Sequence, residues 1–292
     1  MTRHPDRRPI VAGVDPDPGR RMAPAWAADE AARRHVPLRL VHAEGTPTGG
    51  YRGREVPPSW EGWNEALHKA GRKVLEEAAA FVTDRQPRLE VDVLLSEGDP
   101  VWVLREHSRD AAAVVLGSRH LRRGQEVFGS HAVALPLMAH AHCPVVVVPA
   151  PEHITQDPAY FVVGVDGSEH CAAAVDVAFE EAALRGAVLR ALLVREPGAS
   201  RIFDGSPSEQ ECRLVLSETV AGHRARFPEV DLRQEVVTGH PVDVLTAASA
   251  HALGLVVGTR GGGGFAGMLL GSVSQGVLRH AGCPVIAVPA RG

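Results

Sequence analysis

The chain contains the same series of short segments twice, in the same order. The clearest pair is 113–119 (AVVLGSR) and 254–260 (GLVVGTR). The other pairs are 9–15 with 161–166, 38–43 with 189–194, 98–101 with 239–242, and 140–145 with 280–285. Matches that keep their order indicate a duplicated structural unit. We therefore predict two copies of one domain, residues 1–150 and 160–292, joined by a linker over 149–159 that contains three prolines.

Each copy alternates short, valine-rich apolar runs with segments of helical periodicity. Apolar runs of this kind are typical of strands that are covered by helices on both faces. Alternating strands and helices predict an α/β fold with a parallel, doubly wound sheet and right-handed crossovers. The predicted strands cover 9–15, 37–43, 89–96, 112–117 and 144–149, and in the second copy 160–166, 187–194, 231–238, 253–258 and 284–289. The predicted helices cover 20–35, 60–85, 100–110 and 131–141, and in the second copy 169–185, 208–227, 241–251 and 272–281.

A glycine-rich turn follows the fourth predicted strand of the second copy. The turn reads Gly258-Thr259-Arg260-Gly261, and Gly271-Ser272-Val273-Ser274 opens the next helical segment after nine more residues. Glycines let backbone N–H groups turn toward a ligand, and the N-terminus of a helix favours phosphate. Ser272 stands where a helix N-cap is expected. These residues predict a nucleotide phosphate site, and Asp166 and Gly258 end the two strands expected to flank the switch point of the sheet.

Composition excludes several other classes of protein. Hydrophobic residues make up 45% of the chain, enough for a globular core, and the net charge of −4 with no basic stripe argues against nucleic acid as a partner. No apolar run reaches the roughly 18–20 residues of a membrane span, and no secretory signal is visible at the start. The four cysteines form no CxxC pair, so we expect a reduced, cytoplasmic protein.

The spacing Gly-x2-Gly-x9-Gly-Ser after strand four, with Gly-Val-Asp closing strand one, resembles the universal stress protein family. Two copies in one chain resemble its tandem members. The resemblance implies five strands in the order 3-2-1-4-5 in each half, with helices on both faces, and ATP or a related adenine nucleotide as ligand, alone or with Mg²⁺. It also implies that the edges of the last strands, 144–149 and 284–289, join the two halves.

Residue by residue, the resemblance implies that Asp166 meets the ribose or adenine region and that the Val194 backbone meets the adenine edge. The residues that hold phosphates and ribose would be Gly258, Gly261, Gly271, Ser272 and Val273. Arg260 lies between two of these glycines, and its position suggests a further charged donor.

The first half departs from this pattern. Asp15, Gly117 and Arg119 are in place, but His120 stands where Gly261 is expected, and His131-Ala132 align with Gly271-Ser272. A Gly129-Ser130 pair is present with its spacing shortened by one residue, and the charged loop 121–126 replaces Gly262-Gly263-Gly264. We therefore expect the first site to be weakened, lost or altered in ligand preference.

Competing interpretations of the same residues are weaker. The sequence 262–267 also spells GxGxxG, but it precedes the last helix rather than the first, and no P-loop GxxxxGK[ST] occurs. Asp15 and Asp166 are also typical turn residues, so for each a turn role stands beside the ligand role. The run 140–143 (HAHC) has no second cluster at metal-ligand spacing, so no metal site is predicted, and Cys143 and Cys283 are expected to be buried and inert.

The sequence thus predicts an ATP-binding stress-response sensor or regulator with no or slow ATP hydrolysis and no catalytic residues. Its expected partners are an adenine nucleotide, a regulatory protein and a second copy of the chain. Two alternatives stay open: an enzyme that hydrolyses ATP or transfers a nucleotidyl group, and a ligand-free scaffold in which the glycines only shape loops.

Overall fold

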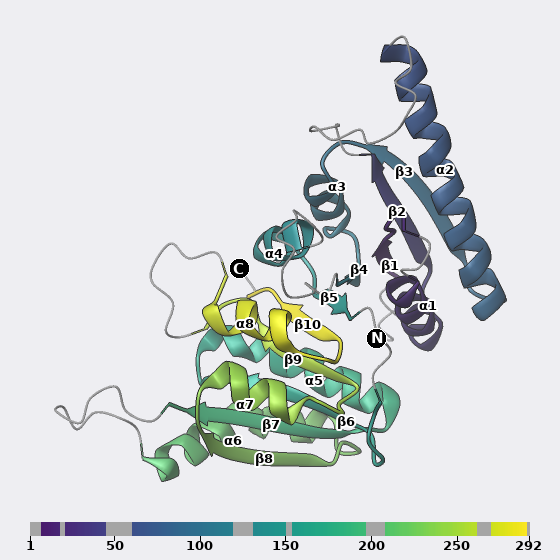
Figure 1. The fold of residues 1–292 in the computed structure, drawn as a ribbon. Coiled ribbons are helices and arrows are strands. Elements are labelled where there is room, and N and C mark those ends of the chain that lie inside the picture. The colour runs from purple at the N-terminus through teal and green to yellow at the C-terminus, as the bar shows by residue number, and fades with distance from the viewer. Residues whose placement is uncertain are drawn as a thin grey trace. The chain divides into compact units, whose positions relative to one another are not determined.

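The computed structural model describes residues 7–17, 21–44, 60–118, 131–149, 154–196, 208–261 and 270–290. The chain folds into two compact units, with the main division after Ala150. The first domain contains β1 to β5 and the second β6 to β10, and each is described by itself (Figure 1). The segments that follow the second strand of each copy, 45–59 and 197–207, and the Gly-rich segment 262–267 lie outside the described residues.

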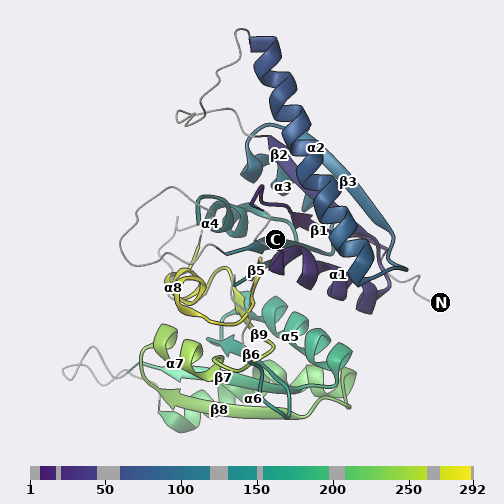
Figure 2. The same ribbon diagram turned by 45° about the vertical axis from the view of Figure 1, so that its right-hand side comes forward.

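The first domain is a parallel sheet of five strands in the order β3-β2-β1-β4-β5. Its strands are β1 (Ile10–Gly13), β2 (Leu38–Glu44), β3 (Val91–Glu97), β4 (Ala113–Gly117) and β5 (Val145–Val148). Its helices are α1 (Met22–Arg34), α2 (Trp60–Arg85), α3 (Pro100–His107) and α4 (His131–His140). Figure 2 shows α2 running along β2 and β3, against which it packs.

The second domain repeats this sheet in the order β8-β7-β6-β9-β10. Its strands are β6 (Tyr160–Val165), β7 (Val188–Arg195), β8 (Leu232–Thr238), β9 (Gly254–Gly258) and β10 (Val285–Val288). Its helices are α5 (Ala172–Arg185), α6 (Glu209–Arg226), α7 (Pro241–Ala248) and α8 (Ser272–His280), and a short 3-10 turn, η1 (Glu169–Cys171), precedes α5. The predicted order 3-2-1-4-5 is therefore confirmed in both halves.

Helices cover both faces of each sheet, which explains the apolar strands. In the second domain α5 packs beside α6 and α7 beside α8, and the two pairs lie on opposite sides of the strands (Figure 1). All four residues of β10 and the first four of β9 are buried. Strands buried on both faces favour Val, Leu and Ile at every position rather than an alternating pattern.

Helix ends follow local chemistry. At the start of α3 the Asp99 carboxylate accepts hydrogen bonds from the N–H groups of Val101 and Trp102, at 2.9 and 3.1 Å. Ser208 and Glu211 form a reciprocal capping box at the start of α6. The helix predicted over 241–251 ends at Ala248, where the buried Ser249 hydroxyl donates to the Thr246 carbonyl at 3.1 Å. This hydrogen bond satisfies one of the terminal carbonyls that the helix leaves without a partner.

Candidate functional site

A cleft of about 500 Å³ opens at the carboxyl edge of the second sheet. It lies where β6 meets β9, the point at which the strand order reverses direction. All nine residues that the sequence singles out in this half line it: Asp166, Val194, Gly258, Arg260, Gly261, Gly271, Ser272, Val273 and Ser274. The volume falls within the range of small-molecule sites, and this is the place where open α/β sheets bind ligands.

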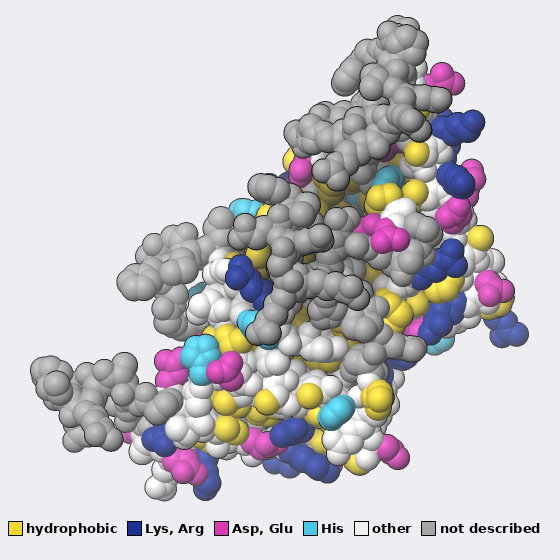
Figure 3. Space-filling view, in the orientation of Figure 1, with side chains coloured by type: hydrophobic (Ala, Val, Ile, Leu, Met, Phe, Trp, Pro, Cys, Tyr) yellow, Lys and Arg dark blue, Asp and Glu magenta, His cyan; other side chains and the backbone are white. Residues whose placement is uncertain are grey.

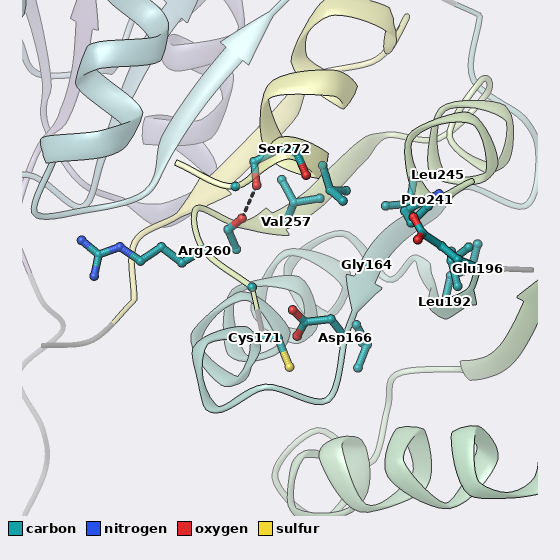
Figure 4. Close-up of a pocket in the computed structure, with 17 residues that line it drawn as sticks. Gly164, Asp166, Cys171, Leu192, Glu196, Pro241, Leu245, Val257, Arg260 and Ser272 are labelled. Carbon is teal, nitrogen blue, oxygen red and sulfur yellow. Dashed lines mark hydrogen bonds between the residues drawn. The ribbon is translucent and has the colours of Figure 1, made fainter. Parts of the chain in front are cut away.

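One part of the cleft is apolar. Its walls come from the ends of β7 and β9 and from the first turns of α7, through Leu192, Val194, Val257, Pro241 and Leu245 (Figure 4). Apart from Val194, these residues were not predicted from the sequence. A signal was present, because Pro241 belongs to the repeated Gly-x-Pro-Val segment and Leu192 lies two residues before Val194, on the same face of the strand.

The Asp166 carboxylate lies against the glycine turn. Its Oδ1 accepts hydrogen bonds from the Ser168 N–H at 3.0 Å and from the Ser168 hydroxyl at 2.7 Å, which is the turn role expected of an Asp. Its Oδ2 lies so close to Gly261 that a Cβ on that residue would be 2.5 Å from it. Only glycine lets the turn approach the carboxylate this closely, so the pairing of Asp166 with Gly261 has a steric cause.

Two hydrogen bonds tie the turn after β9 to the start of α8. The Ser274 hydroxyl donates to the Gly258 carbonyl at 2.6 Å, the bond drawn in Figure 4. The Gly271 N–H donates to the Thr259 carbonyl at 2.8 Å. These bonds fix the first turn of α8, whose leading N–H groups have no acceptor within the helix, beside the glycine turn. A helix N-terminus in this setting favours an anion.

The prediction that Ser272 is the N-cap of α8 is wrong by one residue. Gly271 is the N-cap of α8, with φ −67° and ψ 148°, and makes no side-chain cap bond. Ser272 is the first helical residue and is exposed. The extended backbone of Gly271, set by the bond of its N–H to Thr259, decides where the helix begins.

Arg260 and Cys171 add two further groups to the walls. The Arg260 side chain is exposed and extends outward from the turn, away from Asp166 (Figure 4). Cys171, which the sequence analysis passed over, lies in η1 with 3% of its surface exposed. Burial is the main cause that raises the pKa of its thiol, so Cys171 is a neutral, poorly nucleophilic part of the wall.

The first domain places two of its three predicted residues at the corresponding edge. The Oδ1 of Asp15 accepts a hydrogen bond from the Asp17 N–H at 2.9 Å, a turn like that of Asp166, and Gly117 ends β4. Arg119 lies outside the described residues, as do His120, the loop 121–126 and the Gly129-Ser130 pair. α4 begins at His131, whereas the aligned Gly271 is still the N-cap of α8.

At the base of the site, the first domain has Leu116 where the second has the smaller Val257. A Cβ on Gly13 would lie 2.7 Å from Leu116 Cδ2. At the equivalent Gly164 the corresponding contact, to Val257 Cγ1, is 3.6 Å. The larger Leu116 therefore occupies space next to β1 that the smaller Val257 leaves open next to β6.

Other predicted features can be placed in the described part of the chain. All four cysteines are free and buried, and burial raises the pKa of Cys143 to about 12 and that of Cys283 to about 11. Among the described residues, no three His, Cys, Asp or Glu side chains are grouped so as to hold a metal ion, and no helix is long and apolar enough to cross a membrane. Figure 3 shows positive and negative side chains interspersed on the described surface of one face.

Comparison with known proteins agrees with this architecture. The family model described as the universal stress protein family matches residues 6–149 and again 161–289. Universal stress protein Rv2005c of Mycobacterium tuberculosis is 36% identical over an alignment of 294 positions, gaps included, that covers 95% of this chain and 95% of that protein. A crystal structure of a universal stress protein from Archaeoglobus fulgidus has the same fold, with a TM-score of 0.69 and 16% identity over 97% of this chain and 96% of its own. A universal stress protein solved in complex with cAMP is 28% identical and covers 46% of this chain and 98% of its own, with a TM-score of 0.35. The chain therefore belongs to the universal stress protein family and carries two tandem copies of its domain.

Proposed function

We propose that the second domain binds ATP in the cleft between β6 and β9, and that the chain works as a nucleotide-dependent regulator of a stress response. The main observation in support is that the nine residues assigned to a nucleotide site, from the glycine turn and from the family resemblance, line one cleft of about 500 Å³. A loop shaped by glycines for other reasons would not have to bring an Asp, a helix N-terminus and an apolar wall into the same cleft.

We propose a position in the cleft for each part of ATP. The adenine would lie in the apolar part near Val194, with the ribose near Asp166. The phosphates would lie between the glycine turn and the first N–H groups of α8, within reach of Arg260. The fit is supported by Gly261, because any larger residue would fill the space beside Asp166. Mg²⁺, if bound with ATP, would neutralise phosphate charge and be held mainly by the nucleotide.

We propose no or slow hydrolysis. Rapid phosphoryl transfer needs a group that orients the attacking water and stabilises the charge near the γ-phosphate. The carboxylates that line the described cleft are Asp166, which is held by Ser168, and Glu196, which lies near the apolar wall. Glu196 is at the other end of the cleft from the glycine turn, and Asp166, although it lies against that turn, accepts two hydrogen bonds from Ser168.

The proposal is tested by the nucleotide that the protein carries. Protein purified without added nucleotide is denatured, and the released adenine nucleotide is measured per chain. We expect one ATP per chain for the natural protein and none for Gly261→Glu, because the new side chain would collide with Asp166 and bring a negative charge to the phosphates.

A matched control separates the site from the substitution. A Cβ on Gly222 in α6 meets nothing within 4 Å, so Gly222→Glu adds the same charge and bulk in open space and should keep the bound ATP. Release of ADP, with steady turnover above a metal-only blank, would favour an enzyme instead. No bound nucleotide and no binding of added ATP with Mg²⁺ would contradict the proposal and leave a scaffold.

Location and assembly complete the proposal. Four buried free thiols suit the reduced environment of the cytoplasm. We propose that the chain also forms a homodimer, which light scattering with and without ATP would reveal as a doubled mass.

A further inference from the structure

We propose that Glu196 determines which nucleobase the cleft accepts, by receiving a hydrogen bond from the exocyclic amino group of adenine. This inference rests on the proposed binding of ATP and names a residue that selects its base. It predicts that the cleft discriminates a 6-amino purine from a 6-oxo purine of the same size and charge.

Glu196 lies at the end of the cleft that we propose holds the nucleobase. It directly follows β7 and lines the cleft together with Leu192 and Val194 of that strand. Figure 4 shows its carboxylate beside Pro241 and Leu245, on the side of the cleft away from Arg260 and Ser272. The ligand's charged phosphates and its base would thus lie at opposite ends, and the carboxylate stands at the end where the walls are apolar.

The Glu196 carboxylate is not engaged elsewhere in the described part of the chain, where it makes no hydrogen bond or ion pair. The neighbouring cation, Arg195, is turned to β8, where its Nη2 donates to the Thr238 hydroxyl at 3.1 Å. By contrast, the other carboxylate in the cleft, Asp166, is occupied by Ser168. Glu196 is therefore the carboxylate whose oxygens can accept a hydrogen bond from the nucleobase.

The chemistry of a carboxylate sets the preference. An ionised carboxylate only accepts hydrogen bonds. The 6-amino group of adenine offers two N–H donors, whereas the 6-oxygen of hypoxanthine is an acceptor and would face Glu196 with like partial charge. The same negative charge also disfavours phosphates at this end, so it helps to orient the nucleotide with its phosphates toward α8.

The size of the effect follows from exposure. Glu196 is an exposed residue, so water competes for its oxygens and the discrimination is smaller than in a closed site. Since one charge-assisted hydrogen bond is at stake, we expect ATP to bind about tenfold more tightly than ITP.

The experiment measures the Kd of ATP and of ITP by calorimetry for the natural protein and for Glu196→Gln. A glutamine amide can donate as well as accept, so it suits either base, and we expect the ITP-to-ATP ratio of Kd to fall from about ten to about one. Glu229 is exposed in the same domain and does not line the cleft, so Glu229→Gln removes the same charge and should keep the natural ratio.

The outcomes separate the inference from the proposal beneath it. If ATP binds and the ratio is the same in Glu196→Gln as in the natural protein, the role of Glu196 is overturned while ATP binding stands. If GTP binds the natural protein more tightly than ATP, the carboxylate reads the N–H donors of guanine, and the assignment to adenine is wrong. If the natural protein binds none of these nucleotides, the proposed function itself fails.

Discussion

Two serines at the start of α8 differ sharply in their surroundings. Ser274 is 4% exposed, and its hydroxyl donates to the Gly258 carbonyl at 2.6 Å. Ser272, two residues earlier, is exposed and is not the helix cap that the sequence predicts. The structure therefore assigns the stabilising role to Ser274, because its position on the helix faces β9.

We predict that Ser274→Ala lowers the free energy of unfolding by about 1–2 kcal/mol, because it leaves the Gly258 carbonyl without this donor. It should also weaken ATP binding, since the bond fixes the glycine turn beside the helix. Chemical denaturation followed by circular dichroism, and the Kd of ATP, measure the two effects. Ser272→Ala is the control and should change stability by less than about 0.5 kcal/mol. Equal losses for both variants would mean that the bond from Ser274 is not the cause.

At the scale of elements, α7 and α8 approach each other through a glycine. A Cβ on Gly276 of α8 would lie 2.4 Å from Val242 Cγ2 of α7. Both helices supply walls of the cleft, through Pro241 and Leu245 on one side and 271–274 on the other. The width of the cleft therefore depends on a close contact between two helices, made by residues that are 34 positions apart in the sequence.

Gly276→Ala tests this contact. Alanine usually stabilises a helix interior relative to glycine by roughly 0.5–1 kcal/mol. Here we expect a net loss of about 1–3 kcal/mol, because the added methyl overpacks the contact with Val242. The double variant Gly276→Ala with Val242→Ala should recover part of that loss, which a double-mutant cycle in chemical denaturation would measure. A Gly276→Ala protein more stable than the natural one would contradict the close packing.

A second feature at this scale recurs in both domains. An Asp in the first helix binds basic side chains near the end of the second helix. In the first domain Asp29 of α1 accepts from Arg85 at 2.8 and 2.7 Å, and from Gln86 at 2.9 Å. In the second domain Asp176 of α5 pairs with His223 at 3.0 Å and with Arg226 at 2.8 Å. The two domains thus link the same pair of helices from different positions, because Asp29 aligns with Glu180 rather than with Asp176.

The link in the first domain makes stability depend on pH. Burial raises the pKa of Asp29, but the hydrogen bonds from Arg85 and Gln86 outweigh it, and the net pKa is lowered. An Asp with a lowered folded pKa stabilises the protein above the unfolded pKa of about 3.9 and loses this contribution as the pH falls through the folded pKa. Asp29→Asn should cost about 1 kcal/mol at pH 7, since the pair is partly exposed, and should flatten the loss of stability below about pH 4.

Tryptophan fluorescence measures the effect of Asp29 on stability in the first domain. All four tryptophans, at positions 26, 60, 63 and 102, are in the first half of the chain. Urea unfolding at pH 7 and pH 3 therefore reports the first domain for the natural protein and for Asp29→Asn. The same decrease from pH 7 to pH 3 in both proteins would show that Asp29 does not contribute to the acid sensitivity.

The whole molecule contains one fold twice, with different residues at the carboxyl edge of each sheet. The strand order and parallel pairing are the same in both domains. At the base of the site, however, Leu116 replaces Val257, and the predicted loop of the first domain has charged residues where the second has glycines. We therefore expect the two domains to respond differently to the same nucleotide.

Hydrogen exchange of the intact chain tests this asymmetry. At 100 times its Kd, ATP should slow amide exchange by up to about 100-fold in 258–261 and 270–275 of the second domain. Exchange in 113–118 and 131–140, the corresponding parts of the first domain, should not change. Gly261→Glu should abolish the protection. Protection of both domains in the natural protein would show that the first site also responds to ATP.

The sequence by itself determined the duplicated fold. Strands covered on both faces are continuous apolar runs, and helices repeat their apolar residues about every 3.6 positions, so both can be recognised from the local sequence. The helix predicted over 60–85, for example, has those bounds in the structure. The glycine spacing also identified one wall of the cleft, where a Cβ on Gly261 would lie 2.5 Å from Asp166 Oδ2. Only the tertiary structure decided the other wall, with Leu192, Pro241, Leu245, Val257 and Glu196, and the contacts of Gly261 with Asp166 and of Gly276 with Val242. These residues come together because separate strands and helices pack at particular distances, and that packing leaves no local period in the sequence.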